Sequence, residues 1–152
     1  MRRLALAVTA ALLLAAGLAS YAAARVVVQR SIAGVKMGMT QAKVRSVLGR
    51  PSRVVHGSNE FGRYVEFRYF GLAVTFQGEA TATNVRTTRA SERTASGIGV
   101  GSSRADVMAK IAGVHCSAAI CTVGRFLPGR KVTTFFIKRG VVFRVALGLV
   151  ID

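Results

Sequence analysis

A short segment that occurs twice is the strongest constraint on how this 152-residue chain folds. Residues 34–51 read GVKMGMTQAKVRSVLGRP and residues 97–114 read GIGVGSSRADVMAKIAGV, with glycine, alanine and valine at matching places. A stretch rich in aromatic and β-branched residues follows each copy. A unit of roughly sixty residues buries little core by itself, so we expect the two copies to share one sheet. Such a scaffold favours an extended face over a catalytic cleft.

Each copy predicts a short helix that begins at a hydroxyl-bearing residue. Thr40 caps a helix over residues 41–48 and Ser103 caps a helix over residues 104–111, because a side-chain oxygen at this position accepts an early backbone N–H. Gly49 suits the left-handed end of the first helix. The first helix is expected to bury an apolar stripe of Val44, Val47 and Leu48.

Alternating apolar and polar residues predict the strands. Residues 64–70 place Tyr64, Glu66 and Arg68 on the face opposite to Val65, Phe67 and Tyr69. Further strands are expected at residues 52–56, 72–76, 120–123, 131–137 and 141–150. The predicted fold class is α+β, with two tandem helix-plus-antiparallel-sheet repeats whose helices pack on one face of a shared sheet.

The start of the chain predicts a signal peptide over residues 1–24, because two arginines precede an apolar run that ends in small residues. The alternative is an uncleaved membrane anchor over residues 4–24, which has about the length of a bilayer span. The other expected segments are a linker or first short strand over 25–31, a first α+β repeat over 32–89, a linker over 90–96 and a second α+β repeat over 97–152.

The formal charge of +16 is high for so small a chain, and the part without Arg2 and Arg3 still carries +14. This excess indicates an anionic partner such as a wall polymer, acidic lipid headgroups or an acidic protein face. The alternative is a compositional bias, because the basic residues are dispersed and mostly arginine. Export and the lack of a recognisable binding motif argue against nucleic acid.

The two cysteines, Cys116 and Cys121, are expected to form a disulfide, as is usual in exported proteins. Their spacing differs from that of a thioredoxin-like pair, and a single adjacent histidine does not make a zinc site. We therefore expect no metal and no cofactor.

No set of residues in the sequence points to catalysis. The glycine-rich segment 97–103 lacks the spacing of a phosphate-binding loop, so it reads as a turn before a helix. His115 and the adjacent Cys116 would point to opposite faces of an extended chain, which argues against a thiol nucleophile. No two acidic residues are spaced as an acid–base pair. The sequence therefore predicts a protein that is not an enzyme.

Residues for partner binding are expected at hairpin tips and on the open sheet face. An apolar side chain at a turn can anchor a partner, although it can equally fold back over the sheet edge. Arg86 and Arg144 are also expected on the open face, as solvated side chains or as contacts. The candidate partner-binding residues are Glu60, Phe61, Tyr64, Arg68, Phe126, Leu127 and Arg130.

The first copy resembles the small outer-membrane assembly lipoproteins of the SmpA/OmlA type, through Gly38-Met39-Thr40, Val44 and Leu48-Gly49 with Pro51. A tandem pair of such units is also similar to the β-lactamase inhibitor protein family. The resemblance implies helices on one face of an antiparallel sheet with the other face open. These signature residues have folding roles, so the resemblance transfers no function, and the chain lacks the cysteine that anchors the lipoproteins.

The expected function is that of an exported, non-enzymatic binding module of the cell envelope, periplasmic or extracellular. It would recognise an envelope or secreted protein, or an anionic wall or lipid component. One alternative is a membrane-anchored structural accessory of envelope assembly, which contacts the membrane through residues 4–24. A second alternative is a secreted protein that resembles an enzyme inhibitor.

Overall fold

The structure is a computed structural model that describes residues 25–152. The predicted signal peptide or anchor at residues 1–24 lies outside the described residues. Within residues 25–152, two helices and ten strands follow one another: β1 Val26–Val27, β2 Ser31–Ile32, α1 Gln41–Leu48, β3 Arg53–Asn59, β4 Gly62–Tyr69, β5 Leu72–Gln77, β6 Asn84–Thr87, α2 Arg104–Lys110, β7 His115–Cys116, β8 Ile120–Val123, β9 Lys131–Lys138 and β10 Val141–Leu149.

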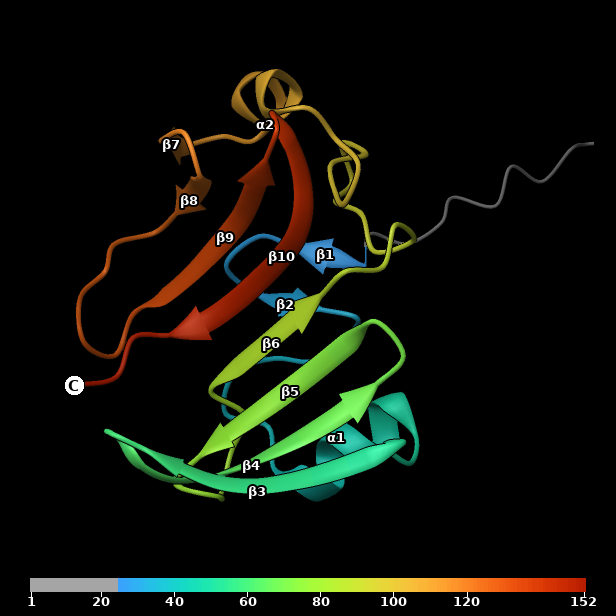
Figure 1. The fold of residues 1–152 in the computed structure, drawn as a ribbon, viewed down its shortest axis with the longest axis vertical. Helices are drawn as coiled ribbons and strands as arrows, with labels where there is room; N and C mark the ends of the chain where they lie inside the picture. The colour runs from blue at the N-terminus through green and yellow to red at the C-terminus, as the bar shows by residue number, and fades with distance from the viewer. Residues whose placement is uncertain (1–24) are drawn as a thin grey trace, which may run out of the picture.

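Eight of these strands form one antiparallel sheet in the order β3-β4-β5-β6-β10-β9-β8-β7 (Figure 1). The pairing of β6 with β10 joins the first four strands of the sheet to the last four. The remaining strands, β1 and β2, pair with each other. β2 packs against the centre of the large sheet, beside β6 and β10.

One face of the sheet carries the hydrophobic core, because apolar residues alternate along the strands and point to the same side. The rings of Phe67 on β4 and Phe76 on β5 are fully buried and meet edge to face, with 4.8 Å between their centroids. From the other half of the sheet, Phe135, Val145 and Leu147 join the same core. The opposite face of the sheet is called the open face below.

The predicted caps of both helices are confirmed. The Thr40 hydroxyl accepts a hydrogen bond from the Lys43 backbone N–H, and the Ser103 hydroxyl accepts one from the Asp106 backbone N–H. Gly49 ends α1 at a φ of 81°, a conformation that favours glycine. These interactions are local, which is why the sequence alone was sufficient to predict them.

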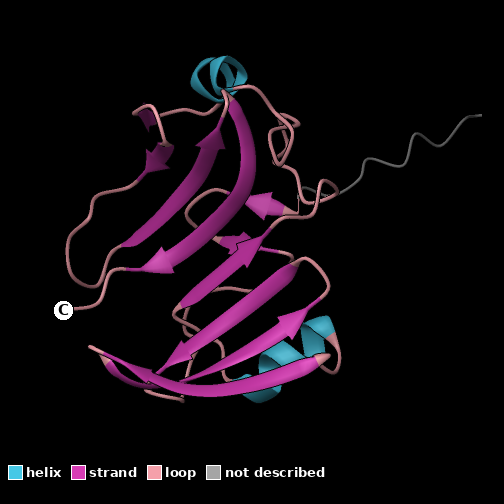
Figure 2. Cartoon of the chain, in the orientation of Figure 1, coloured by secondary structure: helices cyan, strands magenta, loops and turns pink. Residues whose placement is uncertain are grey.

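The predicted fold class, an α+β fold of two tandem repeats with helices packed on one face of a shared sheet, is wrong. Strand accounts for 45% of the structure and helix for 12% (Figure 2). The helices have only eight and seven residues, and each contains a single buried residue, Val44 in α1 and Val107 in α2. Val47, expected in the buried stripe, is 40% exposed. Helices of two turns cover too little area to form a layer of their own.

The segment before the first helix supplies much of the missing cover. Val26, Ile32 and Val35 are buried in the same core as the sheet. The backbone N–H groups of Arg25 and Val26 both donate to the carbonyl of Arg93. Glu92 is 1% exposed and accepts a 2.9 Å hydrogen bond from the Arg25 side chain. This ion pair ties the first described residue to the middle of the chain.

The strand predictions are largely confirmed, and β8 has the predicted bounds. The expected strand at residues 52–56 is longer, since β3 runs to Asn59 and leaves only Glu60 and Phe61 in the turn. The predicted disulfide between Cys116 and Cys121 is present and links β7 to β8. Within residues 25–152, neither helix has the length and apolar character needed to cross a bilayer.

Candidate functional site

The open face is defined by rows of side chains that cross the strands. Partners in an antiparallel ladder point to the same side of a sheet, so the register of each pair identifies the members of a row. One row crosses all eight strands and is basic in its first half. From β3 to β7 it consists of Arg53, Arg68, Ala73, Arg86, Ala146, Thr134, Thr122 and His115.

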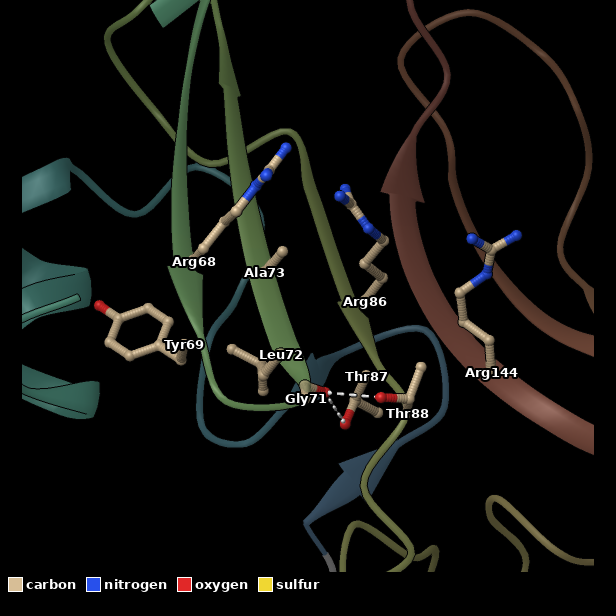
Figure 3. A pocket seen from close by; sticks show the side chains of 9 residues that line it. All are labelled: Arg68, Tyr69, Gly71, Leu72, Ala73, Arg86, Thr87, Thr88 and Arg144. Atoms are coloured by element: carbon tan, nitrogen blue, oxygen red, sulfur yellow. Dashed lines mark hydrogen bonds between the residues drawn. The ribbon is translucent and has the colours of Figure 1, made fainter. Parts of the chain in front are cut away.

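Three arginines of this face surround a shallow depression of about 210 Å³. Arg68 lies on β4, Arg86 on β6 and Arg144 on β10, and the three side chains project to the same side of the sheet (Figure 3). The short side chain of Ala73 on β5 stands between Arg68 and Arg86 and leaves the space open. We call this depression, with its three arginines, the arginine pocket.

Glu66 is the acid beside the arginine pocket, and it is nearly buried at 6% exposure. Its carboxylate accepts a 2.7 Å hydrogen bond from Arg68 Nε and lies 2.9 Å from Arg86 Nη2. Thr75 lies 3.3 Å from the same carboxylate. Burial by itself raises the pKa of Glu66, but the Arg68 hydrogen bond and the charge of Arg86 outweigh it, so the pKa lies below the ordinary value of 4.5. Glu66 is therefore an ionised counter-charge that fixes two of the three guanidinium groups.

Arg144 differs from the other two arginines because no acid neutralises it within residues 25–152. Its guanidinium lies 4.2 Å from the ring centroid of Phe136 and 5.4 Å from that of Phe143. Its Nε is buried and has no hydrogen-bond partner among the described residues. A buried donor without a partner costs stability unless a ligand or water satisfies it.

The β4–β5 turn forms the rim of the arginine pocket. The Gly71 carbonyl accepts hydrogen bonds from the Thr87 hydroxyl at 3.2 Å and the Thr88 hydroxyl at 3.4 Å, which holds the turn against β6 (Figure 3). Gly71 has a φ of 64°, and a Cβ there would lie 3.0 Å from the Arg89 side chain. Phe70, at the tip of the turn, is 94% exposed. The rim thus combines an ordered turn with one fully exposed aromatic ring.

Two of the predicted binding residues, Tyr64 and Arg68, lie on the open face, but only Arg68 lines the arginine pocket. Tyr64 lies opposite Gly57 in the β3–β4 ladder, where its ring occupies the space that a Cβ of residue 57 would take. Glu60 and Phe61 form the β3–β4 turn, as predicted, and Phe61 is 45% exposed. The structure does not bring this turn together with the arginines.

The other predicted residues belong to the connection between β8 and β9. Phe126 is 63% exposed and lines a second depression on the open face, whereas Leu127 and Arg130 line a separate, polar depression with Gln29. The seven predicted binding residues therefore do not form one site. Arg86 and Arg144, expected on the open face but not selected as binding residues, do join Arg68.

Comparisons with known proteins supply no identity. No protein-family model matches the sequence, and no curated protein matches it. A solved structure, that of a DUF4309 family protein (YjgB) from Bacillus subtilis subsp. subtilis strain 168, is similar at 15% identity over 72% of this chain and 78% of that chain, with a TM-score of 0.44. This similarity supports neither a family nor a function, and the resemblance drawn from the first helix remains a prediction.

The described residues also offer no group of three or more His, Cys, Asp or Glu side chains that could hold a metal ion. The polar groups at the arginine pocket are guanidinium groups and hydroxyls, and the adjacent Glu66 carboxylate is paired with Arg68 and Arg86. Guanidinium groups favour ligands with carboxylate or phosphate oxygens, which accept two hydrogen bonds from one arginine.

Proposed function

We propose that this protein is an exported, non-enzymatic binding module that recognises an anionic component of the cell envelope at the arginine pocket. The observation that carries the proposal is the imbalance of charge on the open face. Three guanidinium groups face one carboxylate, which leaves a formal charge of +2, and no acid within residues 25–152 neutralises Arg144. An oxyanion bound beside the Arg144 guanidinium would supply the missing counter-charge.

The state of Glu66 supports binding rather than acid–base chemistry. A general acid or base works best with a pKa near the working pH and a free path to its substrate. Glu66 has a lowered pKa and is engaged by Arg68, Arg86 and Thr75. Such a carboxylate orients its arginine neighbours and stays charged.

The disulfide supports the exported part of the proposal. Bonds between cysteines persist mainly in oxidising compartments, and Cys116 and Cys121 pair across the β7–β8 hairpin. The net charge of +16 further favours an acidic partner. A wall polymer and an anionic lipid both present phosphate or carboxylate groups of the required kind.

Titration of the purified full chain with inorganic phosphate at low ionic strength tests the anion site. Arg144→Gln should weaken binding about tenfold, because a charged hydrogen bond contributes about 1.5–3 kcal/mol. Arg50→Gln is the matched control, since it removes the same charge from an exposed residue outside the pocket. Calorimetry that shows no phosphate binding, or equal losses in the two variants, would contradict the proposal.

A further inference from the structure

The open face carries a trough that continues from the arginine pocket along β10. Ala146 and Gly148 of β10 point to this face, opposite Arg86 and Asn84 of β6. A Cβ on Gly148 would lie 3.0 Å from the Asn84 side chain. Because Ala146 and Gly148 have little or no side chain, they form the floor of a trough between the longer side chains of the neighbouring strands.

The walls of the trough are mostly apolar. On the β9 side, Val132, Thr134 and Phe136 point to the same face as Ala146 and Gly148. The β8–β9 connection adds Phe126, which is 63% exposed. Together these groups bound a depression of about 270 Å³, which is lined by Asn84, Phe126, Val132, Thr134, Phe136, Ala146, Gly148, Leu149 and Val150. We call this depression the apolar trough.

The apolar trough and the arginine pocket are adjacent. Arg86 lies beside Ala146 in the β6–β10 ladder, and Arg144 lies beside Phe136 in the β9–β10 ladder. The Arg144 guanidinium covers the Phe136 ring at 4.2 Å, so one side chain borders both depressions. From Arg144 to Gly148 the strand advances about 13 Å, at about 3.3 Å per residue. One extended molecule of about this length can therefore reach from the arginines toward Phe126 at the other end of the trough.

Charge decides between the possible occupants of this surface. A second copy of the chain would bring another +16 to a face that is already basic, so self-association is electrostatically unfavourable. A neutral apolar molecule would leave the Arg144 guanidinium without a counter-charge, since no acid within residues 25–152 pairs with it. A ligand with an oxyanion at one end and an apolar body at the other satisfies both ends of the surface.

We propose that the open face binds a single-chain amphiphile, with its carboxylate or phosphate head at Arg68, Arg86 and Arg144 and its apolar tail in the trough that ends at Phe126. This inference rests on the proposed function and specifies its ligand class. The head supplies a counter-charge for Arg144, and the tail covers Phe136, Ala146 and Phe126. Anionic envelope lipids with one acyl chain have this chemistry.

Paired ligands that differ only in the tail test the proposal. The full chain is titrated calorimetrically with inorganic phosphate and octyl phosphate, and with acetate and decanoate, all below the concentration at which micelles form. A tail of several buried methylenes should tighten binding at least about tenfold, because each contributes a favourable transfer free energy. A gain for either long-chain ligand over its short analogue supports the proposal and shows whether the head is phosphate or carboxylate.

Variants at exposed phenylalanines locate the tail. The tail gain is the affinity for a long-chain ligand divided by the affinity for its short analogue. Phe126→Ser should lower the tail gain at least about threefold and leave the affinity for inorganic phosphate unchanged. Phe61→Ser is the matched control, because Phe61 is also exposed at a turn but does not line the trough. Ala146→Leu fills the trough floor and should have the same effect as Phe126→Ser, and a thermal melt of each variant shows whether it is folded.

The outcomes separate the two proposals. If phosphate binds and the long-chain ligands bind no more tightly than their short analogues, the amphiphile proposal is wrong while the anion site stands. If none of the four ligands binds, both proposals fail. Equal losses in folded Phe126→Ser and Phe61→Ser would also overturn the placement of the tail.

Discussion

Replacement of Glu66 by glutamine should make the protein less stable and, at the same time, a better anion binder. The side chain is nearly buried and holds Arg68 at 2.7 Å and Arg86 at 2.9 Å. Hydrogen bonds to charged groups contribute about 1.5–3 kcal/mol. Arg68 and Arg86 are 48% and 36% exposed, so water replaces part of the loss, and glutamine keeps one acceptor oxygen. We expect the free energy of unfolding to fall by about 1–2 kcal/mol.

The effect of the same substitution on binding has the opposite sign. Loss of the carboxylate raises the formal charge of the arginine pocket from +2 to +3, because Arg68, Arg86 and Arg144 remain. A unit charge at about 4 Å contributes at least about 1 kcal/mol even in water, so phosphate affinity should rise roughly fivefold. A residue with only a structural role would not produce this combination.

Urea unfolding followed by circular dichroism measures the first effect, and phosphate titration by calorimetry measures the second. Glu79→Gln is the control, because Glu79 pairs with the exposed Arg63 at 3.1 Å, away from the pocket. The control should change stability and affinity little. A Glu66→Gln protein whose phosphate affinity falls together with its stability would refute the reasoning.

Three further predictions follow from the structure. The lowered pKa of Glu66 contributes stability that is present above about pH 4.5 and lost as the pH falls through the folded pKa, so acid unfolding curves of wild type and Glu66→Gln should converge below pH 4.5. Reduction of the Cys116–Cys121 disulfide should cost about 2 kcal/mol in urea unfolding, since its loop is short. Phe76→Ala should cost about 3–5 kcal/mol, because the ring is fully buried against Phe67. A loss below about 1 kcal/mol would contradict the described core.

Local signals explain what the sequence could predict. Thr40, Ser103 and Gly49 act within one turn of their own helices, and alternation along a strand identifies its faces without knowledge of its neighbours. The disulfide followed from two cysteines five positions apart. For the same reason Tyr64 and Arg68 were assigned to the open face correctly.

Tertiary packing determines the features that the sequence could not predict. Val47 satisfies the helical period and is still 40% exposed, because α1 is too short to present a whole face to the sheet. Arg86 and Arg144 meet only because β6 pairs with β10, although residues 88–140 separate the two strands in the chain, and no local pattern specifies that register. Glu66 alternates like a solvated residue and becomes buried only when arginines from β4 and β6 close over it.

The wrong fold class has the same origin. Both helices are evident in the sequence, but their periodicity predicts a larger contribution to the core than two buried side chains supply. The segment with Val26, Ile32 and Val35 gave no strong periodic signal, since its strands have only two residues each. It nevertheless supplies buried side chains where a helical layer was expected.

The side-chain signal of Arg144 tests the central claim most directly. In a spectrum that resolves arginine Nε–H groups, inorganic phosphate should shift the Arg144 signal with saturation, because the bound anion would lie beside the guanidinium group of Arg144. The signal of Arg50, an exposed residue outside the pocket, should stay in place. An unchanged Arg144 signal at phosphate concentrations that saturate the protein by calorimetry would contradict an anion site at the three arginines.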